Sequence, residues 1–242
     1  MSVFYTAFAQ SDFFGKCIFL MLFILSSLCW ILLLYKGWYI AREKRAAHLF
    51  RKRVERHEER LLHLDARALL GGALEGANPF ADIFTSLRGK AIDLLNKNHF
   101  FLSAQKPDAA SVHLSASDLE AVESHALTSI SVQSKRLSRH LFFLSTIATL
   151  APFLGLLGTV WGILVTFSAL HQGGLASSNS LVLGGLATAL ATTVLGLLIA
   201  IPALVSYNYL KNATSDFTSD MEDFLYLLLS RLELQYRKTD IS

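Results

Sequence analysis

Residues 141–170 read LFFLSTIATLAPFLGLLGTVWGILVTFSAL, and residues 181–210 read LVLGGLATALATTVLGLLIAIPALVSYNYL. Neither stretch contains a charged side chain, and a third charge-free stretch covers Cys17–Tyr35. A helix needs about 20 apolar residues to cross the hydrocarbon core of a bilayer, so each stretch is long enough to span it. The sequence therefore predicts an all-α membrane protein with three transmembrane helices.

Lys and Arg are concentrated on one side of the first predicted span. Nine of them lie between Lys36 and Arg60, whereas only Lys16 precedes the span. Because positive residues stay on the cytoplasmic side, we expect the N-terminus outside and the C-terminus inside. Glutamates are interleaved with the basic residues, which favours a mixed-sign helix face over a nucleic-acid patch. No small-x-small site follows the apolar run, so we interpret it as a retained span and not as a signal peptide.

These patterns divide the chain into eight segments. We predict an external N-terminus at 1–16, a first transmembrane helix at 17–39, a cytoplasmic helical segment at 40–116, a cytoplasmic extension of helix 2 at 117–140, a second transmembrane helix at 141–170, an external loop at 171–180, a third transmembrane helix at 181–210 and a cytoplasmic amphipathic tail at 211–242.

Spans two and three are expected to extend into a cytoplasmic helical bundle. Ser117 and Glu120 have the spacing of a capping box, and no helix breaker follows, so we predict one continuous helix over Ser117–Leu170. After the third span, apolar residues recur at helical spacing; they are Phe217, Met221, Phe224, Leu228 and Leu232. Further helices are predicted over 41–70, ending at Gly71-Gly72, and over about 80–99.

The second and third spans are rich in small and hydroxyl residues. The candidate residues for a pore lining or proton pathway are Thr159, Thr188, Thr192, Thr193, Pro152 and Pro202, and the candidate residues for helix packing are Gly155, Gly158, Gly162, Gly185 and Gly196. Glycines at this density indicate close helix packing. A threonine in a membrane helix commonly bonds back to a carbonyl one turn earlier and does nothing more. Pro152 and Pro202 each free a carbonyl, which produces either a kink or a polar site inside the membrane.

Neither of these two spans contains Asp, Glu, Lys, Arg or His. Proton transport through lipid normally requires a titratable group at depth. If this chain moves protons, a partner must therefore supply the carboxylate.

Several other classes of function find no support in the sequence. There is no phosphate-binding loop and no nucleophile elbow, so an enzyme is not indicated. The histidines outside the spans show no metal-binding spacing, and no cofactor site is expected. Cys17 and Cys29 are twelve residues apart on one helix and are interpreted as buried apolar residues.

Two motifs in the spans resemble the TolQ/ExbB/MotA proton-channel family. One is the run from Ala151 to Ile163, APFLGLLGTVWGI, and the other runs from Ala189 to Leu197, ALATTVLGL, into Ala200-Ile201-Pro202-Ala203. The strong similarity covers about residues 140–210, and the order of spans agrees as well. The segment 41–116 resembles the family only in position and helicity.

The resemblance implies a homopentamer in the inner membrane whose second and third spans line a central pore. It also implies a single-span partner, TolR-like or ExbD-like, whose aspartate takes up and releases protons, so that proton flow drives work on an outer-membrane or envelope system. The two pore threonines of the family fall on Thr159 and Thr193, and Pro152 and Pro202 lie near the ends of the pore-facing stretches. Many relatives carry a glutamate where this chain has Thr188.

Three alternatives remain open at this stage. Small residues that serve packing alone would make the chain a non-conducting membrane scaffold. Hydroxyl and carbonyl oxygens also suit Na⁺, which allows a sodium-driven version. A flagellar-type stator subunit is a further possibility, although such subunits usually have four spans. TolQ-like and ExbB-like roles are not distinguished by the chain.

Overall fold

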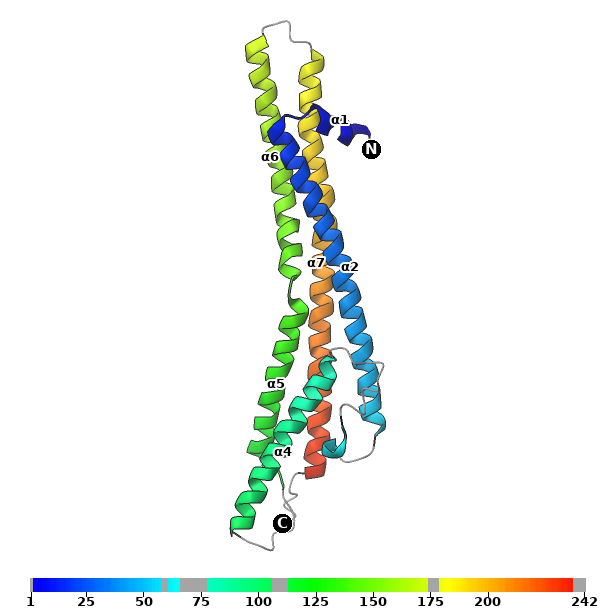
Figure 1. Cartoon of the computed structure of the whole chain (residues 1–242), viewed down its shortest axis with the longest axis vertical. Coiled ribbons are helices and arrows are strands. Elements are labelled where there is room, and N and C mark those ends of the chain that lie inside the picture. Colours follow the sequence, from blue (N-terminus) through cyan, green and yellow to red (C-terminus); the bar gives the residue numbers. More distant parts are fainter. Residues whose placement is uncertain (1, 58–60, 66–77, 106–112, 174–178, 237–242) are drawn as a thin grey trace. The chain divides into compact units, whose positions relative to one another are not determined.

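The computed structural model describes residues 2–57, 61–65, 78–105, 113–173 and 179–236, which form helices and the short connections between them (Figure 1). In chain order the elements are α1 (Ser2–Gln10), α2 (Phe13–Arg56), η1 (Leu61–His63), α4 (Pro79–Gln105), α5 (Ala116–Ser138), α6 (Leu141–Gly173) and α7 (Asn179–Tyr236). The prediction of an all-α protein is confirmed. Three helices, α2, α6 and α7, are long and apolar enough to cross a membrane, as predicted.

The chain forms two compact units. The span unit comprises residues 1–37 and 140–211, and the bundle unit comprises residues 38–139 and 212–242. Helices α2 and α7 contribute residues to both units. Each unit has its own packing.

In the span unit, α6 and α7 approach each other through glycines. A Cβ atom added at Gly155 would lie 2.9 Å from the carbonyl oxygen of Thr192, and one added at Gly196 would lie 2.6 Å from that of Ala151. Such distances leave no room for a side chain at these positions. Small residues of this kind are the usual means by which membrane helices bring their backbones close together. Gly162 likewise faces Ala189.

The bundle unit has an aromatic core. The rings of Phe80 and Phe224 are stacked with centroids 4.6 Å apart, and Phe50 meets Phe224 edge-on at 6.2 Å. All five apolar residues predicted for the inner face of the C-terminal tail are fully buried. They lie on α7, which runs without a break from the third charge-free stretch to Tyr236, so the extension of the third span is one helix.

The prediction of one helix over Ser117–Leu170 is wrong. Helix α5 ends at Ser138 and α6 begins at Leu141, because His140 between them has a left-handed backbone with φ of 74°. Histidine adopts this conformation more readily than most residues do. No glycine or proline marks the position, so the sequence carries no breaker signal there.

Other local predictions also need correction. The capping box of α5 is formed by Ser115 and Asp118 instead of Ser117 and Glu120. The helix expected over 41–70 ends at Arg56, where the Arg231 guanidinium donates to the carbonyl oxygens of Val54 and Glu55.

The helix expected at about 80–99 extends from Pro79 to Gln105, and Gly71-Gly72 lies outside the described residues. Cys29 is buried as expected, whereas Cys17 is exposed.

Candidate ion-path site

Three threonines meet where α6 packs against α7. The hydroxyls of Thr159 on α6 and Thr193 on α7 form a short hydrogen bond, and Thr193 also donates to the carbonyl oxygen of Gly155 at 3.0 Å. Thr192 donates to the same carbonyl at 3.1 Å and to that of Ala189 at 2.7 Å. The structure therefore brings together residues that are 34 positions apart in the sequence.

The hydroxyls of this threonine cluster (Thr159, Thr192 and Thr193) have more acceptors than they can use at once. Thr159 alone lies within 3.1 Å of the carbonyl oxygen of Gly155 and 3.3 Å of that of Ala189, in addition to the hydroxyl of Thr193. A hydroxyl has one hydrogen to donate and a carbonyl oxygen has two lone pairs. The hydrogens can therefore be redistributed by rotation of the hydroxyls, without any movement of the backbone.

The cluster is only partly accessible in the single chain. Thr192 is buried, with 3% of its surface exposed, while Thr159 and Thr193 are half-buried. Thr192 fits against Gly158, where an added Cβ would lie 2.5 Å from its hydroxyl oxygen. The absence of a side chain at Gly158 is what allows this threonine to reach across the interface.

The remaining predicted residues do not join the cluster. Thr188 is half-buried, and its hydroxyl donates to the carbonyl oxygen of Gly184 in its own helix at 2.9 Å. Gly185 packs against Thr166 of α6. Pro152 and Pro202 lie inside α6 and α7, where each removes one backbone N–H donor. Ser206 donates to the carbonyl oxygen of Pro202 at 2.6 Å.

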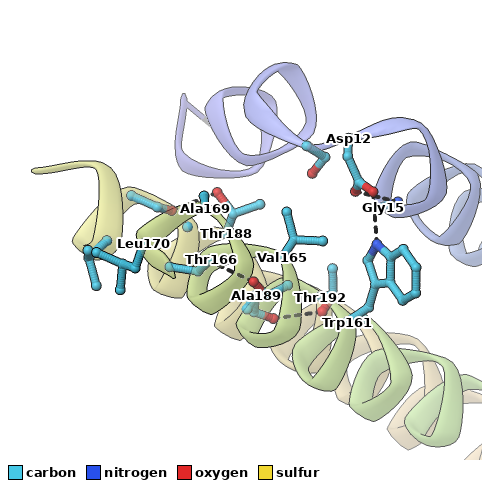
Figure 2. Close-up of a pocket in the computed structure, with 16 residues that line it drawn as sticks. Asp12, Gly15, Trp161, Val165, Thr166, Ala169, Leu170, Thr188, Ala189 and Thr192 are labelled. Atoms are coloured by element: carbon cyan, nitrogen blue, oxygen red, sulfur yellow. Dashed lines mark hydrogen bonds between the residues drawn. The ribbon is translucent and has the colours of Figure 1, made fainter. Parts of the chain in front are cut away.

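Next to the cluster lies a cavity of about 600 Å³ within the span unit (Figure 2). Its lining includes Asp12, Trp161, Thr166, Thr188 and Thr192. Figure 2 shows that Asp12 lies on the N-terminal segment, which forms one side of the cavity. The hydroxyl residues Thr166, Thr188 and Thr192 lie on α6 and α7.

Asp12 is a residue of this site that the sequence did not reveal. Its carboxylate accepts hydrogen bonds from the Gly15 backbone N–H at 3.0 Å and from the Trp161 indole N–H at 2.8 Å. Asp12 lies just before Phe13, a position typical of a helix cap, and the capping role could therefore be predicted from the sequence. The bond to Trp161, 149 residues away, has no local signal in the sequence.

The span unit and its threonine cluster define a multi-pass helical membrane protein in which small and hydroxyl residues join the second and third spans. Residues 96–223, more than half of the chain, match the family described as the MotA/TolQ/ExbB proton channel family. The chain therefore belongs to the MotA/TolQ/ExbB proton channel family, as the sequence motifs predicted.

The individual relatives divide between two names, ExbB and TolQ. The chain is 41% identical over 88 residues to the biopolymer transport protein ExbB of Aquifex aeolicus, which covers 36% of this chain and 59% of the relative. It is 41% identical over 83 residues to the Tol-Pal system protein TolQ of Haemophilus influenzae, covering 34% and 36%. The chain thus spans less than two thirds of either relative. Against ExbB of Salmonella typhimurium the identity is 28% over 235 residues, covering 96% and 86%.

Proposed function

We propose that this protein is an inner-membrane proton-channel or stator subunit, TolQ-like or ExbB-like, that couples the proton-motive force to mechanical work on an outer-membrane or envelope system. The observation that carries the proposal is the hydroxyl pair of Thr159 and Thr193, placed between two spans that have no charged side chain. Rotating hydroxyls and adjacent carbonyl oxygens can accept and pass on a proton. Membership of the proton channel family supports this function.

The carboxylate that loads and releases the proton within the spans is proposed to come from a partner. That partner would be a single-span protein, TolR-like or ExbD-like, whose aspartate cycles against the threonine cluster. A homopentamer of this chain would surround it, with α6 and α7 of each copy toward the centre. The large apolar side chains that are exposed on these helices in the single chain, such as Phe153 and Leu198, are then available to lipid or to neighbouring copies.

The charge distribution supports one orientation in the membrane. With the N-terminus outside and the C-terminus in the cytoplasm, the basic residues from Lys36 onward are cytoplasmic. The connection at 171–180 carries no Lys or Arg and is then external.

A non-conducting scaffold is the second candidate. The glycine contacts between α6 and α7 favour it, because they account for the small residues by packing alone. So does the bond from Thr159 back to the carbonyl oxygen of Gly155, which is a common structural use of a membrane threonine.

Substitution of Thr159 separates the two candidates. Thr159→Val keeps the shape and removes the hydroxyl, so we expect the complex with its single-span partner to assemble with unchanged native mass but to lose energy transduction. Thr146→Val is the matched control, because Thr146 lies on the same helix and donates only to the carbonyl oxygen of Phe142. Full activity of Thr159→Val would support the scaffold and remove the assigned role.

A further inference from the structure

The cavity in the span unit connects a negative charge to the threonine cluster. Asp12 is exposed at one side, and Thr192 lines the cavity while donating to the carbonyl oxygens of Gly155 and Ala189. Those carbonyl oxygens are also within hydrogen-bond distance of Thr159. A continuous series of oxygen atoms therefore leads from the cavity into the cluster.

The hydrogen-bond partners of Asp12 are neutral groups. Both of its oxygens accept from neutral donors, one from Gly15 and one from Trp161. Within the described residues, no Lys, Arg or His side chain is in ion-pair contact with it. Because Asp12 is exposed, water and small cations have access to its carboxylate.

Most of the cavity lining is apolar, but its polar part offers oxygen atoms that water and small cations can contact. Thr166, Thr188 and Thr192 line it from two helices, and Ser11 lines it from the N-terminal segment. Each hydroxyl donates its hydrogen to a backbone carbonyl oxygen and keeps its own oxygen as an acceptor. At about 600 Å³ the cavity is large enough for several water molecules, each of which takes about 30 Å³ in the liquid. Clefts with one sign of charge and low-dielectric walls concentrate counter-ions.

We propose that this cavity is a hydrated vestibule through which cations reach the threonine cluster, and that Asp12 is the carboxylate that attracts them. The Trp161 indole N–H donates to one carboxylate oxygen of Asp12, and the Trp161 ring packs against Phe14 with centroids 4.4 Å apart. The inference depends on the proposed function, since it supplies an entrance for the ion. It adds a carboxylate from this chain at the entrance, separate from the one proposed for the partner.

Helix capping alone would also account for Asp12. A cap needs one acceptor oxygen, and Asn or Ser supplies it as well as Asp does. The proposal differs because it requires the negative charge. A test must therefore measure the effect of the charge on ions in the cavity and not the stability of α2.

Cysteine reactivity provides that test in the full-length protein. Val165 lines the cavity, so Val165→Cys is introduced after Cys17→Ser and Cys29→Ala. The thiol is reacted in membranes with a cationic trimethylammonium methanethiosulfonate and with its anionic sulfonate counterpart. We expect the cationic reagent to be favoured about tenfold over the ratio for a free thiol, because of the local field. Phe23→Cys, on an exposed apolar position of α2, is the control that lipid should shield from both reagents.

The negative charge of Asp12 is removed in a variant that lacks the Trp161 indole N–H, so that two hydrogen-bond donors do not face each other. Asn at position 12 would turn an N–H₂ group toward the indole N–H, so Trp161→Phe is compared with Trp161→Phe/Asp12→Asn. The cationic preference should persist in the first variant and fall to the free-thiol ratio in the second. Absence of labelling at Val165→Cys would overturn the hydrated vestibule, and a ratio unchanged by Asp12→Asn would overturn the role of Asp12.

The test is independent of ion conduction. If Thr159→Val remained active while the cationic preference was present, the threonine path would fail and the vestibule would stand; the converse result would remove only the vestibule. Occupancy by Na⁺ is tested by comparing NaCl with N-methylglucamine chloride at equal ionic strength. Slower labelling in Na⁺ shows that Na⁺ occupies the vestibule, and equal rates show that it does not; either result, with the charge effect present, supports the proposal.

Discussion

The two units of this protein place their large apolar side chains in opposite ways. In the bundle unit, Phe80 and Phe224 are fully buried and stacked on each other. In the span unit, the interface of α6 and α7 is made of glycine, alanine and threonine, while Phe153 is 68% exposed.

The difference follows from the solvent that each unit meets. In water, burial of aromatic rings is the main stabilising contribution. In lipid, large apolar side chains gain little by leaving the hydrocarbon, so helices associate through close backbone contact and hydrogen bonds. The span unit can therefore place hydroxyls inside and leave them free to rearrange, which the bundle unit does not need.

The largest expected effect is on the bundle unit. Phe224→Ala removes a fully buried ring that contacts both Phe80 and Phe50, so the free energy of unfolding should fall by about 3–5 kcal/mol. Denaturant titration in detergent, followed by the near-ultraviolet signal, measures the change. Phe153→Ala in the span unit is the comparison and should change stability far less. Equal losses would mean that the two units do not differ in the way described.

A smaller effect is expected at the glycine contact. Gly196→Ala places a methyl group 2.6 Å from the carbonyl oxygen of Ala151, so α6 and α7 must separate, at a cost of about 1–3 kcal/mol. Thermal unfolding of the protein in detergent measures it. Gly37→Ala is the matched control in the same unit, because an added Cβ meets nothing within 4 Å there. That control should raise stability by about 0.5–1 kcal/mol. A neutral Gly196→Ala would show that the close approach is not needed.

The smallest effect is a pH dependence of the bundle unit. Burial raises the pKa of the Glu43 carboxyl above 4.5, and Arg136 offsets the rise only in part. Among the residues that the structure describes, the Glu43 oxygen Oε2 has no hydrogen-bond partner. The folded state then holds the proton to higher pH than the unfolded state does. The free energy of unfolding should therefore fall as pH rises from about 4.5 through the raised pKa.

Glu43→Gln tests the origin of that fall. The amide cannot ionise, so the variant should lose less stability than the native protein between acid and neutral pH. The measurement is the midpoint of denaturant unfolding at a series of pH values. A variant with the same slope as the native protein would assign the pH dependence to other groups.

Much of this architecture was open to prediction from residue patterns. Charge-free length alone identifies three spans, and the spacing of Phe217, Phe224 and Leu228 identifies the buried face of the C-terminal helix. The residue pattern did not predict where a helix is interrupted by an unusual backbone conformation. The break between α5 and α6 depends on the left-handed backbone of His140, and a histidine at this position does not by itself require that conformation.

The candidate site divides in the same way. Thr159 and Thr193 were found because they lie in motifs, and the structure shows their hydroxyls in contact. Asp12 was missed because its partner Trp161 lies on a distant segment, and such a pairing has no period in the sequence. Helical spacing places Thr188 on one face with Thr192, but the Thr188 hydroxyl donates to the carbonyl oxygen of Gly184 within its own helix.

The most direct test of the central claim is proton flux through the complex of this chain with its single-span partner, reconstituted in liposomes, for Thr159→Ser and Thr159→Val. Serine keeps the hydroxyl and loses a methyl group, whereas valine keeps the shape and loses the hydroxyl. If the hydroxyl carries protons, flux should be largely retained in Thr159→Ser and abolished in Thr159→Val. Flux that survives in Thr159→Val and declines in Thr159→Ser would show that position 159 serves packing, and would contradict the account.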